Sequence, residues 1–290
     1  MVNKMKQLVL VFIVVGTTTL GFSQEREIVY TFFANVANEQ FRGPLIGIVN
    51  VGQGDRKGLQ FFGINVNTGN FGGLQLGGLN VAPSVGGAQI AGINITYKEM
   101  KGTQIGGINI ARHSINGVQF GFINFVDSAV NCIPMGFLFS IVRHGGYRAI
   151  EYSFSEFYPV NIAYKFGVEK FYNTVFLSYN PFEQFSGVGY GFGSILPYPI
   201  NASFFFNPEC NSFVSLGKKS NIITSIVPYF GYSFTKKMSV IIGPSVTWQA
   251  LNKFRETPQS PFFYITNNEI DEKNSIVVGA RVGFRYRFNQ

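Results

Sequence analysis

The sequence predicts an all-β protein: an antiparallel transmembrane β-barrel of about eight strands, preceded by a β-repeat module with a 15-residue period. Three observations support this fold class. Only 13% of the 290 residues are charged, whereas 16% are aromatic and 34 are glycine. Close copies of a nine-residue unit recur through the first half of the chain. In the second half, apolar and polar residues alternate, which is typical of strands with one apolar face.

The N-terminus has the features of an export signal. Lys4 and Lys6 precede an apolar run from Leu8 to Val15, and small residues follow around Ser23. This order is typical of a signal peptide, which we place at residues 1–23. The apolar run is too short for a membrane-spanning helix, which needs about 20 residues. We therefore expect an exported chain, with residues 24–42 as a lead-in to the repeats.

Residues 43–143 are predicted to form seven repeats. One unit is "GLQLGGLNV", which runs from Gly73 to Val81. The first unit has Leu45 at the Gln position, and the degenerate last unit has Pro134 there and Phe139 at the Asn position. The aligned asparagines, with steps of 15, 15, 14, 15 and 15 residues, are Asn50, Asn65, Asn80, Asn94, Asn109 and Asn124. The aligned glutamines are Gln60, Gln75, Gln89, Gln104 and Gln119.

Within a unit, the apolar residues change face at the glycine pair. A bend there, made easy by the positive φ that glycine adopts, would point the apolar side chains of two short strands the same way. Each unit is then one coil of a β-solenoid, tied to its neighbours by stacked Gln and Asn ladders. The alternative is one barrel strand of about ten residues followed by a turn. The sequence favours the solenoid, and we expect the amides to have a structural role.

Residues 144–290 are predicted to form the outer-membrane barrel. In the first strand, Ile150, Tyr152 and Phe154 share one face, and Glu151 and Ser153 share the other. Similar alternation predicts eight strands near residues 147–157, 161–170, 173–179, 187–196, 200–207, 221–234, 237–250 and 275–288. An even number of antiparallel strands, aromatic on one face and polar or glycine on the other, is typical of outer-membrane barrels.

The predicted loops differ in length at the two ends of the barrel. The turns expected on the periplasmic side are short and lie at residues 171–172, 197–199 and 235–236. The loops on the other side are longer at 180–186, 208–220 and 251–274, whereas 158–160 is short. Long outer loops and short periplasmic turns are typical of transmembrane barrels.

Charged residues on the inward face predict a network inside the barrel. Its expected members are Glu151, Lys165, Glu169, Arg281, Arg285 and Arg287. Buried charges need partners of opposite sign, and this set contains both signs near the seam where the first and last strands meet. An eight-stranded barrel is just filled by its own side chains. We therefore expect this network to plug the barrel rather than to conduct ions or bind a ligand.

Together, the repeats and the barrel strands resemble those of the outer-membrane surface-repeat proteins of Gram-negative bacteria. The resemblance rests on the Gly-x-Gln-x-x-Gly-Ile-Asn unit, on "GGYRAIEYSFSEFYPVNIAYKFGVEKFYNT" from Gly145 and on "SVIIGPSVTW" from Ser239. It covers most of the chain after residue 23. It implies an outer-membrane location and supplies no catalytic or binding residues.

The composition favours a non-enzymatic protein with a structural or surface-interaction role. Residues 1–23 contain two lysines and no acidic residue, so the remainder has 21 basic and 15 acidic residues, a net charge of +6. The basic residues are scattered, which argues against nucleic acid as a partner. The expected partners are outer-membrane lipid and an unidentified surface or periplasmic protein. We expect no cofactor and no metal site.

Three further possibilities remain open at this stage. A larger barrel that includes the repeats as strands would form a pore for small solutes. A lipid hydrolase would need a serine supported by His113 or His144, the two histidines of the chain, although neither follows a recognisable nucleophile motif. Cys132 and Cys210 form one disulfide or remain two buried thiols.

Overall fold

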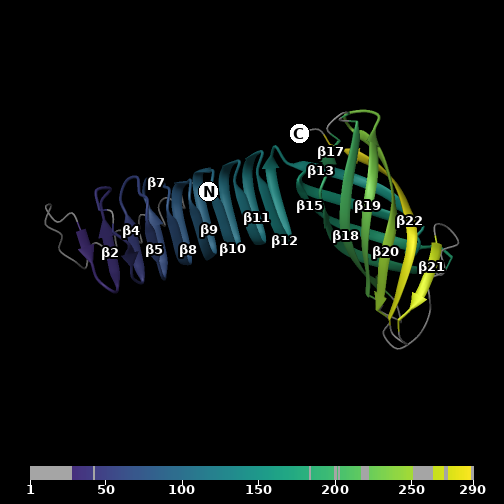
Figure 1. The fold of residues 1–290 in the computed structure, drawn as a ribbon, viewed down its shortest axis with the longest axis horizontal. Helices are drawn as coiled ribbons and strands as arrows, with labels where there is room; N and C mark the ends of the chain where they lie inside the picture. The colour runs from purple at the N-terminus through teal and green to yellow at the C-terminus, as the bar shows by residue number, and fades with distance from the viewer. Residues whose placement is uncertain are drawn as a thin grey trace.

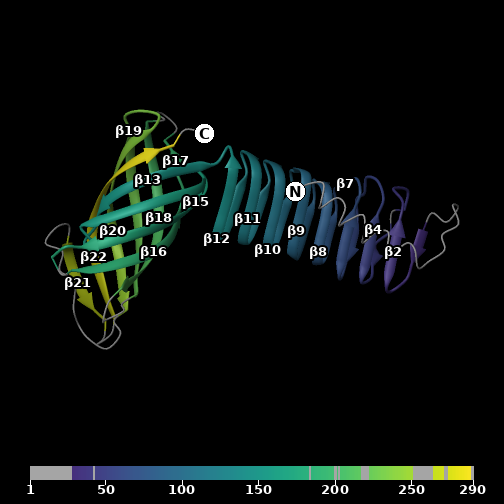
Figure 2. The same cartoon turned by 180° about the vertical axis from the view of Figure 1, so that it is seen from behind.

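The computed structural model consists of two β-structures placed side by side, a stack of coils and a barrel (Figures 1 and 2). It describes residues 28–288 apart from 42, 183, 199–200, 202, 217–221, 251–263 and 271–273. The predicted signal peptide lies outside the described residues. Within them, no helix is both long and apolar enough to cross a bilayer.

The repeats form a parallel β-solenoid. Its long strands are β8 (Leu74–Val85), β9 (Ala88–Met100), β10 (Thr103–Ile115), β11 (Val118–Val130) and β12 (Ile133–His144). Neighbouring strands run in the same direction and pair position by position, so Asn80 lies opposite Asn94 and Asn109 opposite Asn124. This register confirms the solenoid. It also shows that the larger barrel with repeats as wall strands is wrong, because those strands would alternate in direction.

The stack begins earlier than the sequence analysis placed it. Its first strands are β2 (Ala34–Ala37), β3 (Leu45–Ile46), β4 (Val49–Gly52), β5 (Leu59–Phe61), β6 (Ile64–Asn67) and β7 (Asn70–Phe71). Strand β2 pairs in parallel with β4 and brings Asn35 opposite Asn50, so part of the expected lead-in belongs to the stack. Strand β1 (Ile28–Tyr30) pairs antiparallel with β2 and covers the edge that this end would otherwise expose.

The glycine pair marks a bend, but for a different reason from the one expected. Positive φ occurs at this bend only at Phe62 and Gly63, among the described residues. Elsewhere the first glycine of most pairs lies close to the backbone of the preceding coil, and Ala91 takes that position in one coil. A Cβ on Gly106 would lie 2.0 Å from the carbonyl oxygen of Ala91 in the preceding coil. The apolar side chains on both sides of the bend do point the same way, as predicted.

Two irregularities explain the departures from a strict 15-residue period. The step of 14 residues between Asn80 and Asn94 is absorbed by a register shift after Ala82, where strand β9 carries one extra residue. In the last coil, a shift after Gly121 places Ser140 opposite Asn124, so the assignment of Phe139 to the Asn position is wrong. The additional residue lies in the Phe137–Leu138 segment, which bulges outward.

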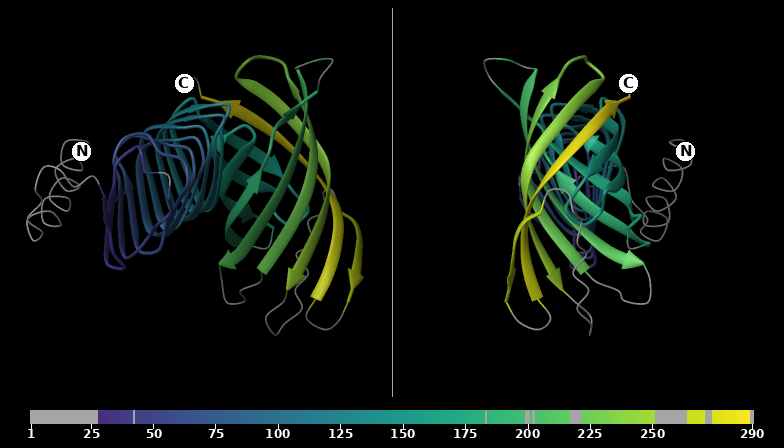
Figure 3. Two further views of the ribbon diagram at one scale, coloured as in Figure 1. Left: turned by 60° about the vertical axis from the view of Figure 1, so that its left-hand side comes forward. Right: turned by 90° about the vertical axis from the view of Figure 1, so that its right-hand side faces the viewer.

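The C-terminal half is a closed antiparallel barrel of eight strands, which confirms the predicted fold class (Figure 3). The wall consists of β13 (Tyr147–Phe154), β14 (Val160–Val168), β15 (Phe171–Asn180), β16 (Phe185–Gly193), β18 (Phe204–Leu216), β19 (Ile222–Ser233), β20 (Met238–Ala250) and β22 (Asn274–Arg287). Strand β13 pairs with β22 and closes the wall. Two short strands, β17 (Leu196–Pro197) and β21 (Tyr264–Glu269), pair with β18 and β22.

The fifth wall strand differs most from its predicted position. The sequence analysis placed a strand at 200–207 and a loop at 208–220, whereas β18 runs from Phe204 to Leu216. The connection before it therefore spans residues 194–203 and is not short. Of the intervals on the opposite side, only the one between β20 and β22 is long. The expected greater length on that side is thus found in this one interval, which contains β21 (Tyr264–Glu269).

The wall of the barrel is apolar outside and polar inside. Exposed apolar side chains on the outer surface include Ile150, Tyr152, Phe154, Ile162, Leu177, Ile226, Phe230, Ile242, Val246 and Trp248. Buried polar side chains on the inner surface include Glu151, Ser153, Asn161, Lys165, Ser178, Glu209, Ser225, Thr247, Arg281 and Arg285. The alternation read from the sequence therefore has its apolar side on the outer surface of the barrel.

The last coil of the solenoid packs against the outside of the barrel. The side chain of Asn173 on β15 accepts a hydrogen bond from the Ser140 backbone at 2.8 Å and donates one to the Gly136 carbonyl at 2.8 Å. The Tyr190 hydroxyl on β16 donates to the Leu138 carbonyl at 2.8 Å. These side chains satisfy the open edge of β12, which would otherwise present unpaired backbone groups.

Candidate functional site

The barrel interior contains a cluster of four buried charges. The Lys165 ammonium lies 2.6 Å from a Glu209 carboxylate oxygen and 3.4 Å from one of Glu151. The Arg285 guanidinium lies 2.6 Å from Glu151 and 3.1 Å from Glu209. All four side chains are at most 3% exposed. Two cations thus face two anions at short range, and the cluster carries no net charge.

Neutral side chains complete this cluster. Asn207 accepts a hydrogen bond from Arg285 at 2.7 Å and donates one to the Tyr172 hydroxyl at 2.6 Å. The Tyr172 hydroxyl in turn donates to Glu209. These additional bonds matter because Coulomb attraction alone does not offset the cost of removing ions from water. The cluster is therefore a hydrogen-bonded structural network rather than a set of free charges, and Nη1 is the nitrogen of Arg285 that has no partner among the described residues.

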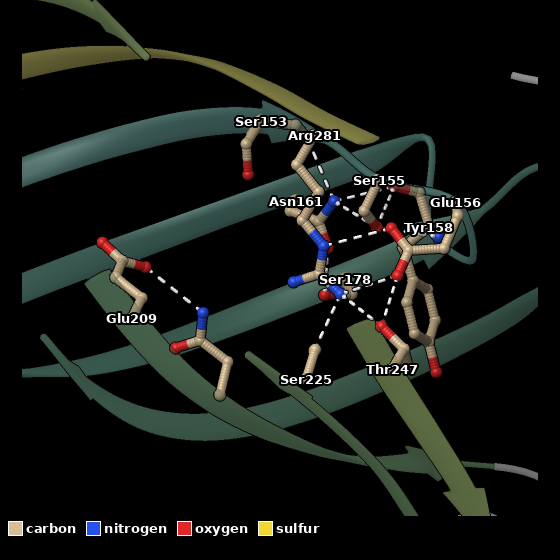
Figure 4. Close-up of polar contacts among 11 residues, drawn as sticks. Ser153, Ser155, Glu156, Tyr158, Asn161, Ser178, Glu209, Ser225, Thr247 and Arg281 are labelled. Carbon is tan, nitrogen blue, oxygen red and sulfur yellow. Dashed lines mark hydrogen bonds and ion pairs between the residues drawn. The ribbon is translucent and has the colours of Figure 1, made fainter. Parts of the chain in front are cut away.

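A second buried group lies nearer the other end of the barrel (Figure 4). Glu156 belongs to the segment between β13 and β14 and folds back into the interior, where Arg281 donates two hydrogen bonds to it at 3.1 Å. Thr247 and Ser225 complete the group. Burial alone would raise the pKa of Glu156, but the Arg281 guanidinium and its hydrogen bonds lower it below its usual value. This pair is also neutral overall.

Two of the residues expected in the network lie elsewhere. Arg287 and Glu169 form an ion pair at the end of the barrel, where their side chains are 43% and 45% exposed. They lie outside the filled interior because β22 ends at Arg287 and β14 ends at Val168. Glu151, Lys165 and Arg285 do come together as predicted, whereas Arg281 joins the separate group around Glu156.

Sequence reasoning missed two of the buried carboxylates. Glu209 was assigned to a loop, yet it alternates with Pro208 and Cys210 on a strand, and the polar series Asn207, Glu209 and Asn211 carries the period of two that could have revealed it. Glu156 has no such signal. Its inward position depends on the return of a loop into the barrel, which alternation along one strand does not encode.

Apolar side chains fill the interior beyond the charges. Phe176 and Phe213 lie with ring centroids 4.2 Å apart, and Tyr158 stacks on Phe213 at 5.5 Å. The glycines of β16 make room for these rings, since a Cβ on Gly189 would lie 1.8 Å from Phe176. The ring that comes closest to Gly189 belongs to its register partner on the neighbouring strand β15. The interior is therefore packed with aromatic and charged side chains.

The solenoid buries its amides in two ladders. Each asparagine donates to the asparagine of the next coil, from Asn35 through Asn124, at 2.8–3.0 Å. Each glutamine from Gln75 to Gln119 donates in the opposite direction, to the preceding coil, at 2.5–2.8 Å. The side chains are at most 1% exposed. Because they point inward and bond to one another, they have no access to a ligand in this conformation.

The two histidines lie on the solenoid surface. His113 and His144 are exposed and lie in register with Ser128 on the strand between them. Nδ1 of His144 lies 3.0 Å from the backbone carbonyl of Asp127. Within the described residues, neither imidazole is hydrogen-bonded to Ser128.

The two cysteines are not bonded to each other. Cys132 is buried with Val126, Val142 and Val168 where the solenoid meets the barrel. Its burial raises the pKa of the thiol, which makes it a poor nucleophile. Cys210 lies on strand β18. In the part of the chain that the structure describes, no group of three or more His, Cys, Asp or Glu side chains is arranged to hold a metal ion.

Comparisons with known proteins add no assignment: the chain matches no model of a protein family, and no curated protein resembles it closely enough to match. The architecture and the repeat motif therefore remain the basis for any statement about function.

Proposed function

We propose that this chain is a non-enzymatic outer-membrane barrel protein that holds a β-solenoid at the membrane, with a structural or surface-interaction role. The observation that carries the proposal is the polarity of the barrel wall, which has apolar side chains outside and hydrogen-bonded charges inside. Strands that alternate apolar outward and polar inward are typical of barrels that cross the outer membrane. Outer-membrane lipid is then the first partner of the chain.

The outer wall is difficult to reconcile with a barrel surrounded by water. Ile226 and Phe230 on β19 are each 61% exposed, and Ile242 on β20 is 60% exposed. Phe230 and Ile242 are register partners, so these side chains form a continuous apolar surface. Soluble monomers rarely expose apolar patches larger than a few hundred Å². Surrounding lipid would remove this cost.

The filled interior supports a structural role over conduction. Neutral groups of paired charges and packed aromatic rings occupy the space through which a solute would pass. Eight strands enclose an interior just wide enough for side chains. We therefore expect no sustained conductance from the protein in planar lipid bilayers. Single-channel steps from folded protein would contradict this part of the proposal.

The proposal can be tested with a matched pair of lysine substitutions. Ile242→Lys places a charge on the wall that we propose to face lipid. Val130→Lys replaces an apolar side chain of similar exposure, 55%, on a water-facing part of the solenoid. A lysine facing the bilayer midplane costs about 2–4 kcal/mol. The chain is refolded into phosphatidylcholine vesicles, and urea unfolding is followed by Trp248 fluorescence. We expect Ile242→Lys to lower the unfolding midpoint and Val130→Lys to leave it unchanged.

The same pair gives the contrary result if the barrel is soluble. Lysine at an exposed position in water is neutral or improves solubility. Equal midpoints for Ile242→Lys and the unchanged protein, in a chain that stays dispersed without detergent, would therefore overturn the proposal. A separate readout is electrophoresis, where the unheated folded protein should migrate apart from the heated one.

A further inference from the structure

Each coil of the solenoid has two edges of different composition. We use the name glycine edge for the ten residues from Gly102 to Ala111 and their equivalents in the other coils. We use the name charged edge for the residues from Arg112 to Asn116 and their equivalents. The equivalents of the glycine edge are 43–52, 58–67, 73–82, 87–96 and 117–126, and none contains Asp, Glu, Lys or Arg. The charged residues between positions 53 and 131 all lie on the charged edge: Asp55, Arg56, Lys57, Lys98, Glu99, Lys101, Arg112 and Asp127.

The side chains that the two edges bury also differ. Under the glycine edge the buried side chains are the amides of the two ladders together with a few apolar side chains such as Ala111 and Val126. The outward side chains of this edge are apolar, such as Phe61, Ile105 and Phe120 at 43%, 39% and 42% exposure. Under the charged edge the buried side chains include Val85 and Met100. The charged edge therefore has charged side chains outside and apolar ones inside, as in a protein surrounded by water. The glycine edge has apolar side chains outside and polar amides inside, as in the barrel wall.

The apolar surface of the glycine edge continues onto the wall of the barrel. Phe139, on the glycine edge of the last coil, stacks on Phe166 of β14 with ring centroids 6.3 Å apart. The hydrogen bonds from Asn173 and Tyr190 also reach this edge, at Gly136 and Leu138. The apolar surface of the last coil is therefore in contact with the surface that we propose to face lipid.

The two edges lie at different depths along the barrel. The charged edge meets the turn between β14 and β15, where Lys170 donates a hydrogen bond to Asn131. The glycine edge meets Asn173 and also Tyr190, whose register partner is Val175. These positions are three and five residues farther along β15, or about 10 and 16 Å at a rise of roughly 3.3 Å per residue. The glycine edge is thus the one displaced toward the middle of the wall.

We infer that the solenoid lies along the membrane, with its glycine edge in the acyl chains of one leaflet and its charged edge in water. The inference rests on the proposed function, because it requires a barrel that spans the bilayer. The leaflet is the one at the end of the barrel that carries the turn at Lys170. Burial of one apolar face in this way is known for interfacial amphipathic helices, which sink about 5–10 Å into the boundary of the acyl chains. Here the amphipathic element is a stack of coils.

Tryptophan fluorescence can test this arrangement because Trp248 is the single tryptophan and lies on the outer wall. The unchanged protein reports on the barrel. In a Trp248→Phe background, Phe61→Trp and Ile105→Trp place the reporter on the glycine edge, far from and nearer to the barrel. His113→Trp places it on the charged edge as a matched control. The full chain is refolded into phosphatidylcholine vesicles with or without bromine on the acyl chains, since bromine quenches tryptophan on contact.

The expected result is quenching of Phe61→Trp and Ile105→Trp to a degree comparable with Trp248, and little quenching of His113→Trp. Quenching of Trp248 without quenching of either glycine-edge reporter would overturn the inference and leave the proposed function intact. Absence of quenching at Trp248 itself would instead contradict the proposed function. Two independent positions on the edge keep the test decisive if one variant fails to fold.

Discussion

The solenoid and the barrel both bury polar side chains, but they satisfy them in different ways. In the solenoid, neutral amides bond to identical amides in an open ladder that passes from coil to coil. In the barrel, charges of opposite sign close on one another in small neutral groups. The comparison teaches that an interior can be polar without being open to solvent, provided that each group finds its partner inside.

The amide ladders and the ion-pair clusters differ in what remains when one side chain is removed. A missing amide removes hydrogen bonds between neutral groups, and the neighbouring amides retain bonds to backbone carbonyls, as Asn80 does to Ile90. A missing charge leaves its partner ionised and buried, which is far more costly. The barrel should therefore be sensitive to single substitutions, and the solenoid more tolerant.

The largest effect is expected for Arg285→Met. This change leaves Glu151 and Glu209 with Lys165 as their ion-pair partner among the described residues. Breaking a buried ion pair in this way costs about 3–5 kcal/mol. Urea unfolding of the vesicle-bound protein, followed by Trp248 fluorescence, measures the loss. Adding Glu151→Gln should recover part of it by removing the uncompensated carboxylate. A loss below about 1 kcal/mol, as for an exposed pair, would contradict the account of the network.

The next effect is expected for Asn94→Leu in the middle of the ladder. It removes the hydrogen bonds from Asn80 and to Asn109. Asn80 keeps its bonds to backbone carbonyls, whereas the side-chain oxygen of Asn109 loses its donor, and a buried polar group left without a partner costs about 1–3 kcal/mol. Asn124→Leu is the control, because Nδ2 of Asn124 has no hydrogen-bond partner among the described residues. Hydrogen exchange by mass spectrometry should show faster exchange around Asn94 than around Asn124. Equal changes would indicate that the ladder adds nothing beyond packing.

Gly106→Ala should destabilise the stack by a steric route. The new Cβ would lie 2.0 Å from the Ala91 carbonyl oxygen, and overpacking of this kind typically costs about 1–3 kcal/mol. Gly86→Ala is the matched control because a Cβ there meets nothing within 4 Å. Hydrogen exchange of the coils containing Ala91 and Gly106 measures the effect. If both variants exchange alike, the glycine pair is not required for close backbone approach.

Acid should separate the two regions. Because the folded-state pKa of Glu156 lies below its usual value of 4.5, its contribution to stability is present above that value and is lost as the pH falls through the folded pKa. The ladder amides do not titrate. Lowering the pH from 6 to 3 should therefore reduce the Trp248-monitored stability of the barrel while the central coils keep their exchange protection. Glu156→Gln should make the decrease smaller; an unchanged decrease would assign it to other groups.

The smallest effect is expected at the ion pair between Arg287 and Glu169, which is nearly half exposed. Exposed pairs contribute about 0–1 kcal/mol because water screens them. Arg287→Ala should therefore leave the urea midpoint almost unchanged, in contrast to Arg285→Met two residues earlier. A loss as large as that of Arg285→Met would place Arg287 in the buried network after all.

The sequence predicts the architecture well because its two periods, the 15-residue repeat and the two-residue alternation, follow from the backbone geometry of the solenoid and of the strands. A repeat of 15 residues with an amide at the same place forces like residues into register, and alternation along a strand determines which side chains share a face. The same logic extends to Asn35, which lies 15 residues before Asn50 and was left in the lead-in. That omission was avoidable.

Other features of the structure could not be predicted from these two sequence periods. Ser140 replaces an asparagine only because one additional residue bulges from the last coil. Glu156 enters the barrel because a loop returns into the interior, and its partner Arg281 is 125 residues away in the sequence.

The measurement that tests the central claim most directly is the state of the chain without residues 1–23 in buffer that contains no detergent or lipid. If the outer wall is built for lipid, the refolded protein should aggregate in buffer and remain monomeric only with detergent or vesicles, because water would otherwise contact the side chains of Ile226, Phe230 and Ile242. Sedimentation velocity distinguishes these states. A single folded monomer in plain buffer would contradict the account.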